Sequence, residues 1–81
     1  MQYRTSGTCS TMIDLTLDDD HIIQDVQFTG GCHGNLQGIC ELVTGQKAED
    51  VISKLEGIRC GFRSTSCPDQ LSKALRKAIS Q

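Results

Sequence analysis

The sequence contains no tryptophan, one tyrosine, two phenylalanines and a single proline. Hydrophobic residues make up 37% of its 81 residues, so the chain can bury one modest core. We therefore expect a single domain over residues 1–81. That length excludes a barrel enzyme, and it excludes a nucleotide-binding domain joined to a catalytic one. A non-enzymatic protein is the favoured class.

An excess of positive charge is also missing, because eight basic residues stand against ten acidic ones. Nucleic acid is therefore not an expected partner. No apolar run is long enough to span a bilayer, and the first residues lack the apolar stretch of a secretory signal. The sequence thus predicts a cytoplasmic protein with no membrane partner. Residues 59–81 are nevertheless basic, which indicates either a solvated helix face or a docking surface for an acidic partner.

The first third of the chain has the pattern of an antiparallel sheet. Residues 13–17 alternate between apolar and polar side chains, and residues 22–28 form a second strand-like run after the polar turn 18–21. Two such runs around a short turn predict a hairpin. Residues 2–6 are polar but rich in β-formers, and we expect them to add a third, edge strand.

After Gly30 the apolar period changes to that of helices. The spacing predicts helices over residues 34–44 and 48–56, and a last helix that opens with Cys67 as N-cap and Pro68 as its first residue. The fold class is therefore α+β, an antiparallel sheet of two to three strands followed by three helices packed on one face. The expected core consists of Ile13, Leu15, Val26, Phe28, Leu36, Ile39, Cys40, Val43, Val51, Ile52, Leu55, Leu71, Leu75 and Ile79.

Five cysteines are unusual for such a chain, and no two of them form a C-x-x-C motif. That absence excludes a zinc ribbon and a thioredoxin motif. In a reducing cytosol the cysteines are core residues, metal ligands or redox centres. Cys40 lies on the apolar stripe of its helix, which predicts a buried core thiol.

Cys9, Cys32 and Cys67 have a different setting. Cys32 and Cys67 stand at expected helix starts, where the helix dipole and unpaired backbone N–H groups favour the thiolate. Cys9 lies in a polar loop that gives it no packing role. For Cys32 and Cys67, the alternative is that each is a small cap or core filler. We predict that the three sulfurs converge on one metal, with His33, Cys60, Asp69 or water as the fourth ligand.

Residues 65–69 read Thr-Ser-Cys-Pro-Asp, the pentapeptide that names the TSCPD domain family. Residues 30–35, Gly-Gly-Cys-His-Gly-Asn, resemble the other motif of that family. The resemblance covers the chain from about Tyr3 to Ile79. It implies an association with deoxyribonucleotide metabolism, because the same domain occurs near the C-terminal end of some adenosylcobalamin-dependent ribonucleotide reductases. A ribonucleotide reductase or a related protein is the implied partner.

The order of hairpin, Gly-Cys, two helices and Ser-Cys is more distantly similar to the NifU/IscU-type iron–sulfur scaffold. That resemblance pairs Cys9, Cys32 and Cys67 with the three cysteines of the scaffold. This chain has Thr11 and Ser66 where the scaffold has an acidic residue and a histidine. The resemblance therefore implies the fold and a three-thiolate site, and not dedicated cluster assembly.

Three function classes follow. The first is a non-enzymatic domain that binds zinc or an iron–sulfur cluster, because both favour tetrahedral thiolate. It would serve as an accessory or interaction module for ribonucleotide reductase. The second is a thiol–disulfide redox protein that uses Cys60 and Cys67. The third is a purely structural oligomerisation domain.

Overall fold

The computed structural model describes residues 1–8, 10–31 and 33–80. In these ranges it has one antiparallel sheet with the order β1-β2-β3, followed by three helices. The strands are β1 (Gln2–Arg4), β2 (Ser10–Leu17) and β3 (Ile23–Gly30). The helices are α1 (His33–Val43), α2 (Ala48–Leu55) and α3 (Cys67–Ser80). The α+β prediction is confirmed, with the edge strand shorter than expected.

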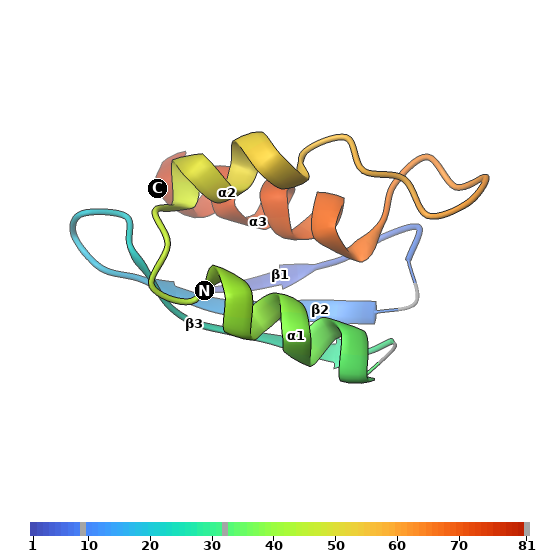
Figure 1. Ribbon diagram of the computed structural model, residues 1–81, viewed down its shortest axis with the longest axis horizontal. Helices are drawn as coiled ribbons and strands as arrows, with labels where there is room; N and C mark the ends of the chain where they lie inside the picture. The colour runs from blue at the N-terminus through green and yellow to red at the C-terminus, as the bar shows by residue number, and fades with distance from the viewer. Residues whose placement is uncertain (9, 32, 81) are drawn as a thin grey trace.

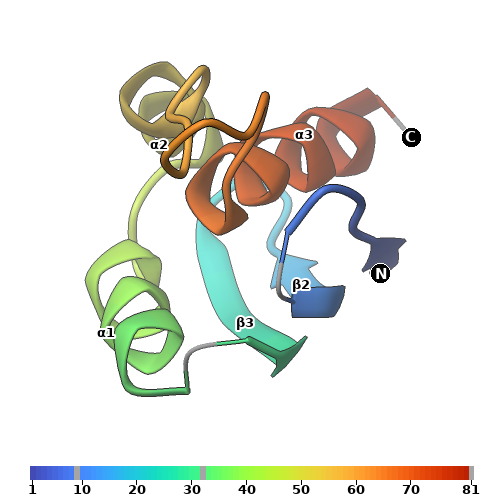
Figure 2. The same ribbon diagram turned by 90° about the vertical axis from the view of Figure 1, so that its right-hand side faces the viewer.

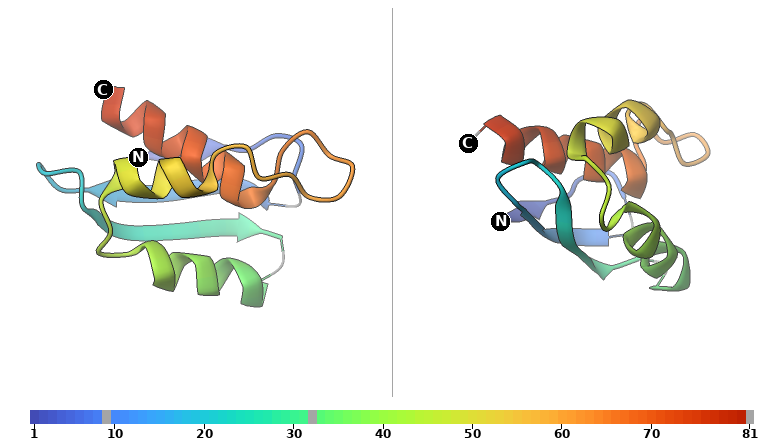
Figure 3. Two further views of the ribbon diagram at one scale, coloured as in Figure 1. Left: turned by 45° about the horizontal axis from the view of Figure 1, so that its top comes forward. Right: turned by 60° about the vertical axis from the view of Figure 1, so that its left-hand side comes forward.

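The helices are arranged in two groups over the sheet. α2 and α3 lie side by side, and α1 runs along β3 (Figure 1, Figure 2). The two termini lie at one end of the molecule. The loop between β1 and β2, the C-terminal end of β3 and the first turn of α3 lie at the other end (Figure 1, Figure 3). The candidate site is at this second end.

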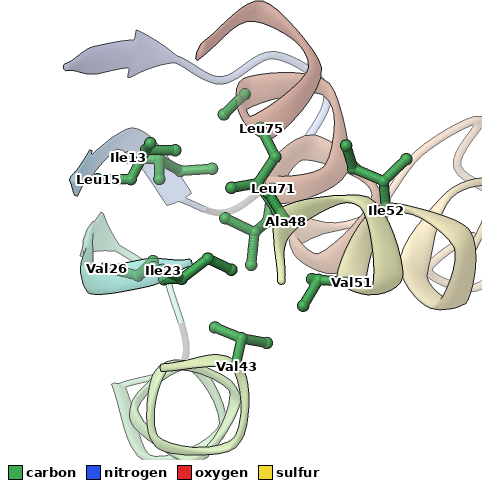
Figure 4. Close-up of a cluster of buried hydrophobic side chains, with 11 residues drawn as sticks. Ile13, Leu15, Ile23, Val26, Val43, Ala48, Val51, Ile52, Leu71 and Leu75 are labelled. Carbon is green, nitrogen blue, oxygen red and sulfur yellow. The ribbon is translucent and has the colours of Figure 1, made fainter. Parts of the chain in front are cut away.

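The two hairpin strands β2 and β3 and the helices α1, α2 and α3 contribute to one hydrophobic core (Figure 4). Leu71 and Leu75 of α3 are fully buried beside Ile13 of β2, and Val43 of α1 lies on the opposite side of the cluster from Leu75. Apolar residues three and four apart on a helix share one face, and this stripe explains the burial. The buried members of the cluster are Ile13, Leu15, Ile23, Val26, Val43, Ala48, Val51, Ile52, Leu71, Ala74 and Leu75.

Ile23 is the main core residue that the alternation of β3 did not predict. A register shift places Leu17 opposite Ile23 and Thr16 opposite Asp25, so Gln24 is an extra residue in β3. An extra residue reverses the inward and outward alternation of a strand. Ile23 and Val26 are therefore both buried, although they are an odd number of residues apart.

Some expected core residues lie at the edge of the core instead of inside it. Phe28, Ile39, Cys40, Leu55 and Ile79 are only partly buried against the cluster. A domain this small has too little interior to enclose every apolar side chain of its amphipathic elements. Cys40 is thus a half-buried thiol of α1.

Candidate functional site

The TSCPD pentapeptide forms the first turn of α3 and the residues just before it. The Ser66 Oγ accepts a hydrogen bond from the Asp69 N–H at 3.1 Å, and the Ser66 carbonyl accepts one from the Gln70 N–H at 2.8 Å. This is the geometry of an N-cap residue. The cap is therefore Ser66, and the prediction that Cys67 caps α3 is wrong by one residue. Cys67 is the first residue of the helix, and its side chain is buried.

The sulfur of Cys67 faces the beginning of β2. The Cys67 Sγ and the Ser10 Oγ lie 3.2 Å apart in a buried hydrogen bond. Further hydroxyls surround Ser10, because the Thr5 hydroxyl donates to the Ser10 carbonyl at 2.5 Å and the Thr8 hydroxyl donates to the same oxygen at 3.1 Å. We call Thr5, Thr8 and Ser10 the hydroxyl cluster. Through Ser10, this cluster gives the Cys67 sulfur a polar neighbour.

Asp69 is the central residue of a second polar network, on the other side of the turn. Its carboxylate is 3% exposed and accepts hydrogen bonds from the Gly57 N–H at 2.8 Å, from the Thr65 hydroxyl and from Lys73 Nζ at 3.0 Å. Both carboxylate oxygens are therefore engaged within the protein. The network fixes the end of α2 and the residues before α3 to the first turn of α3.

The electrostatics of Asp69 reflect two opposing effects. Burial raises the pKa of this carboxyl, whereas the hydrogen bonds from Thr65, Gly57 and Lys73 and the charge of Lys73 lower it. The hydrogen bonds prevail, and the pKa of Asp69 falls to about 2. Asp69 is thus a carboxylate anion at neutral pH, held as an acceptor.

The loop between β1 and β2 is joined to the same network. The Ser6 N–H donates to Gln70 Oε1 at 3.2 Å, and Gln70 Nε2 donates to the Thr65 hydroxyl at 2.9 Å. Gly7 follows with a φ of +74°, and a Cβ at Gly7 would lie 2.9 Å from Thr65 Cγ2. A side chain at Gly7 would separate the two segments. This close approach sets the loop against α3.

Only some of the predicted metal ligands lie within the part of the chain that the structure describes. Cys9 and Cys32 lie outside the described residues, as does the side chain of His33, the first residue of α1. Cys60 is an exposed thiol in the connector between α2 and α3. The convergence of Cys9, Cys32 and Cys67 stays a prediction. Among the side chains that the structure describes, no three from His, Cys, Asp or Glu form a group suited to a metal ion.

Sequence reasoning missed Ser10, Thr65 and Ser66. The spacing of Ser66 and Asp69 is the S-x-x-D pattern of a helix start, which could have identified the cap. The contact between Ser10 and Cys67 had no sequence signal, because the two residues are 57 positions apart. Only the packing of α3 against β2 brings them together.

A model of the TSCPD domain family matches residues 1–79. The chain belongs to the TSCPD domain family. Comparisons with curated proteins and with solved structures gave no match. Within the described parts of this TSCPD domain, no helix is long and apolar enough to cross a membrane. The contacts of Thr65, Ser66 and Asp69 give the named pentapeptide a structural role at the start of α3.

Proposed function

We propose that this TSCPD domain is a metal-binding module in which Cys67 acts with Cys9 and Cys32 as a thiolate ligand of zinc or of an iron–sulfur cluster. The observation that carries the proposal is the position of the Cys67 sulfur, 3.2 Å from the Ser10 hydroxyl. Thr65, Ser66 and Asp69 satisfy one another and the neighbouring backbone. The Cys67 sulfur lies against the first residue of β2.

The neighbours of the other two cysteines support the same location. Ser10 follows Cys9 directly in the chain, and it pairs with Gly30 across the sheet. Gly30 is two residues before Cys32. The residue after Cys9 therefore contacts Cys67, and it pairs with a residue two positions before Cys32.

The chemistry of the described residues suits a bound thiolate. The first turn of α3 lies at the positive end of the helix dipole, which favours negative sulfur. Hydroxyls near a ligand sulfur stabilise its charge and its orientation. Ser10 of the hydroxyl cluster supplies such a group at Cys67. Bound zinc would join segments that are distant in the sequence, and an iron–sulfur cluster would in addition carry one electron.

The fourth ligand is not Asp69 in this proposal. Its two oxygens already accept hydrogen bonds from Gly57, Thr65 and Lys73, and turning it toward a metal would leave those donors without an acceptor inside the protein. Asp69 instead holds the turn that carries Cys67. Cys60, His33 or water completes the coordination.

Elemental analysis with a set of cysteine variants tests the proposal. Protein purified without a metal-affinity tag should contain zinc or iron, and Cys9→Ser, Cys32→Ser and Cys67→Ser should each lose it. Cys40→Ser is the matched control, because Cys40 is a half-buried thiol that lines the cleft between β3 and α1. Metal-free protein that forms a reversible Cys60–Cys67 disulfide would replace this proposal with the redox function. Metal-free protein whose thiols do not react would leave the structural oligomerisation domain as the remaining function.

The resemblance to a reductase domain suggests the partner. We propose that the metal-loaded protein binds an adenosylcobalamin-dependent ribonucleotide reductase as an accessory module. The two purified proteins should elute together in size-exclusion chromatography, and Cys67→Ser should weaken that association. Separate elution of the metal-loaded protein would remove ribonucleotide reductase as its partner.

A further inference from the structure

The connector between α2 and α3 projects beyond the body of the domain (Figure 1, Figure 3). Phe62 near its tip is fully exposed, and Ile58 at its base is 42% exposed. Arg59 and Arg63 flank this aromatic side chain in the sequence, and both are exposed. We call residues 58–63 the arginine–phenylalanine loop. Aromatic side chains and arginine are both enriched at protein–protein contact surfaces.

The arginine–phenylalanine loop is held in shape by backbone hydrogen bonds. The Cys60 N–H donates to the Thr65 carbonyl at 3.1 Å, and the Arg63 N–H donates to the Cys60 carbonyl at 3.0 Å. Gly61 occupies the left-handed region with a φ of +60°, which allows the tight turn before Phe62. A loop that is already ordered loses little conformational entropy when it binds.

The charges of the loop have no partner within its own domain. Lys73 pairs with Asp69 and Arg76 pairs with Glu56, but among the described residues no ion pair involves Arg59 or Arg63. These two guanidinium groups are therefore available to an acidic surface. Arginine is well suited to that contact because it is weakly hydrated and binds carboxylates through two N–H groups.

An acidic surface with an apolar floor lies elsewhere on the same domain. A cleft of about 340 Å³ opens between β3 and α1. Val26, Phe28 and Leu36 line its floor, and Asp25 and Glu41 stand exposed at its rim. Among the described residues neither acid is in an ion pair. The cleft therefore offers apolar contact for a ring and carboxylates for the flanking cations.

The negative potential of the cleft is felt by the thiol of Cys40, which also lines it. Burial raises the pKa of Cys40, and the charges of Asp25 and Glu41 raise it further. A cation at the rim would be attracted by the same two carboxylates. The loop and the cleft are thus complementary in charge as well as in polarity.

We propose that the arginine–phenylalanine loop of one TSCPD domain docks in the β3–α1 cleft of a second copy, with Phe62 in the cleft and Arg59 and Arg63 against Asp25 and Glu41. A nucleic acid is disfavoured as the occupant of the loop, because two arginines on a domain of net charge −2 give little phosphate attraction. The small contact predicts a weak association that salt weakens further. The docking requires no metal.

Sedimentation equilibrium in the presence of a reductant tests the docking, since the reductant prevents disulfide dimers through Cys60. The wild-type protein should associate reversibly, and Phe62→Ser should lower the association constant at least tenfold. The double variant Asp25→Lys, Glu41→Lys should do the same, and these exposed positions leave the core intact. Leu42→Ser is the matched control. Like Phe62, Leu42 is an exposed apolar side chain, but it lies on α1 and does not line the cleft.

A mixing experiment separates this docking from other contacts. Phe62→Ser retains the cleft, and Asp25→Lys, Glu41→Lys retains the loop. Labelled Phe62→Ser protein should therefore show amide shifts confined to β3 and α1 when the unlabelled cleft variant is added. A wild-type chain that stays monomeric up to about 1 mM overturns the proposal. Loss of association in Leu42→Ser but not in Phe62→Ser, or Phe62-dependent binding to an oligonucleotide by a monomer, overturns it as well.

Discussion

Single side chains at the start of α3 have sharply divided roles. Thr65 and Ser66 form hydrogen bonds within the turn. Asp69 accepts hydrogen bonds from three donors, and Cys67 faces Ser10 of β2. Buried polar groups are costly unless they are paired, so each of these contacts constrains the fold. The turn is therefore a rigid support for the Cys67 sulfur.

Asp69→Asn should destabilise the domain. The amide nitrogen cannot accept the hydrogen bonds from Thr65 and Lys73, and we expect a loss of about 1–3 kcal/mol in the free energy of unfolding. Urea denaturation followed by circular dichroism measures this loss. Asp19→Asn, in an exposed turn, is the control and should change stability little. Equal stability of the two variants would mean that the Asp69 network contributes nothing.

Ser10→Ala should weaken the proposed metal site without unfolding the protein. The substitution removes the hydroxyl that lies 3.2 Å from the Cys67 sulfur. Loss of a hydrogen bond to a metal ligand lowers affinity by about 10- to 100-fold. Competition with a chromogenic chelator measures this change. Thr11→Ala, an exposed neighbour, should retain full affinity, and equal affinities for the two variants would contradict the role of Ser10.

At the scale of elements, contacts between loops and helix ends hold this end of the molecule together. The β1–β2 loop touches the residues before α3 through Gly7 and Thr65, and through Ser6 and Gln70. Short strands and helices bury little apolar surface of their own. These loop contacts therefore decide how the end that carries Cys67 is assembled.

The same substitution should have opposite effects at two glycines. Gly7→Ala forces a Cβ to within 2.9 Å of Thr65 Cγ2 at a φ of +74°, and it should cost about 1–3 kcal/mol. Gly38→Ala lies within α1 with nothing within 4 Å of its Cβ, and it should stabilise by up to about 1 kcal/mol. Thermal melts of both variants measure the difference. Stabilisation by Gly7→Ala would show that the loop does not press against Thr65.

The whole molecule depends on one core, which α3 closes over β2 and beside α2. Leu71 and Leu75 are fully buried at its centre. An 81-residue domain has no second core to compensate for a cavity. Core truncation should therefore affect the whole fold at once.

Leu71→Ala should lower the free energy of unfolding by about 2–5 kcal/mol, the usual cost of removing a fully buried leucine side chain. Denaturation should remain a single transition when it is followed by different probes. Leu42→Ala, at a site that is 77% exposed, should cost little. A small effect of Leu71→Ala, or separate transitions for sheet and helices, would show that α3 does not close the core.

Most of the fold was predictable because the period of apolar residues changes from strand to helix near Gly30. The register of β3 was not, since the extra residue at Gln24 depends on pairing with β2 and not on local preference. Ile23 was consequently missed as a core residue. The depth of burial of Phe28 and Cys40 likewise depends on how far α1 covers β3.

The sequence by itself determined the α+β class, the positions of the helices, and Cys67 as a residue at the start of a helix, because these follow from local periodicity and turn chemistry. It also supplied the TSCPD pentapeptide. Only the tertiary structure decided what that pentapeptide does. Packing of α3 on β2 brings Cys67 to Ser10, and the ends of α2 and α3 enclose Asp69, since contacts between distant segments form only when the core closes.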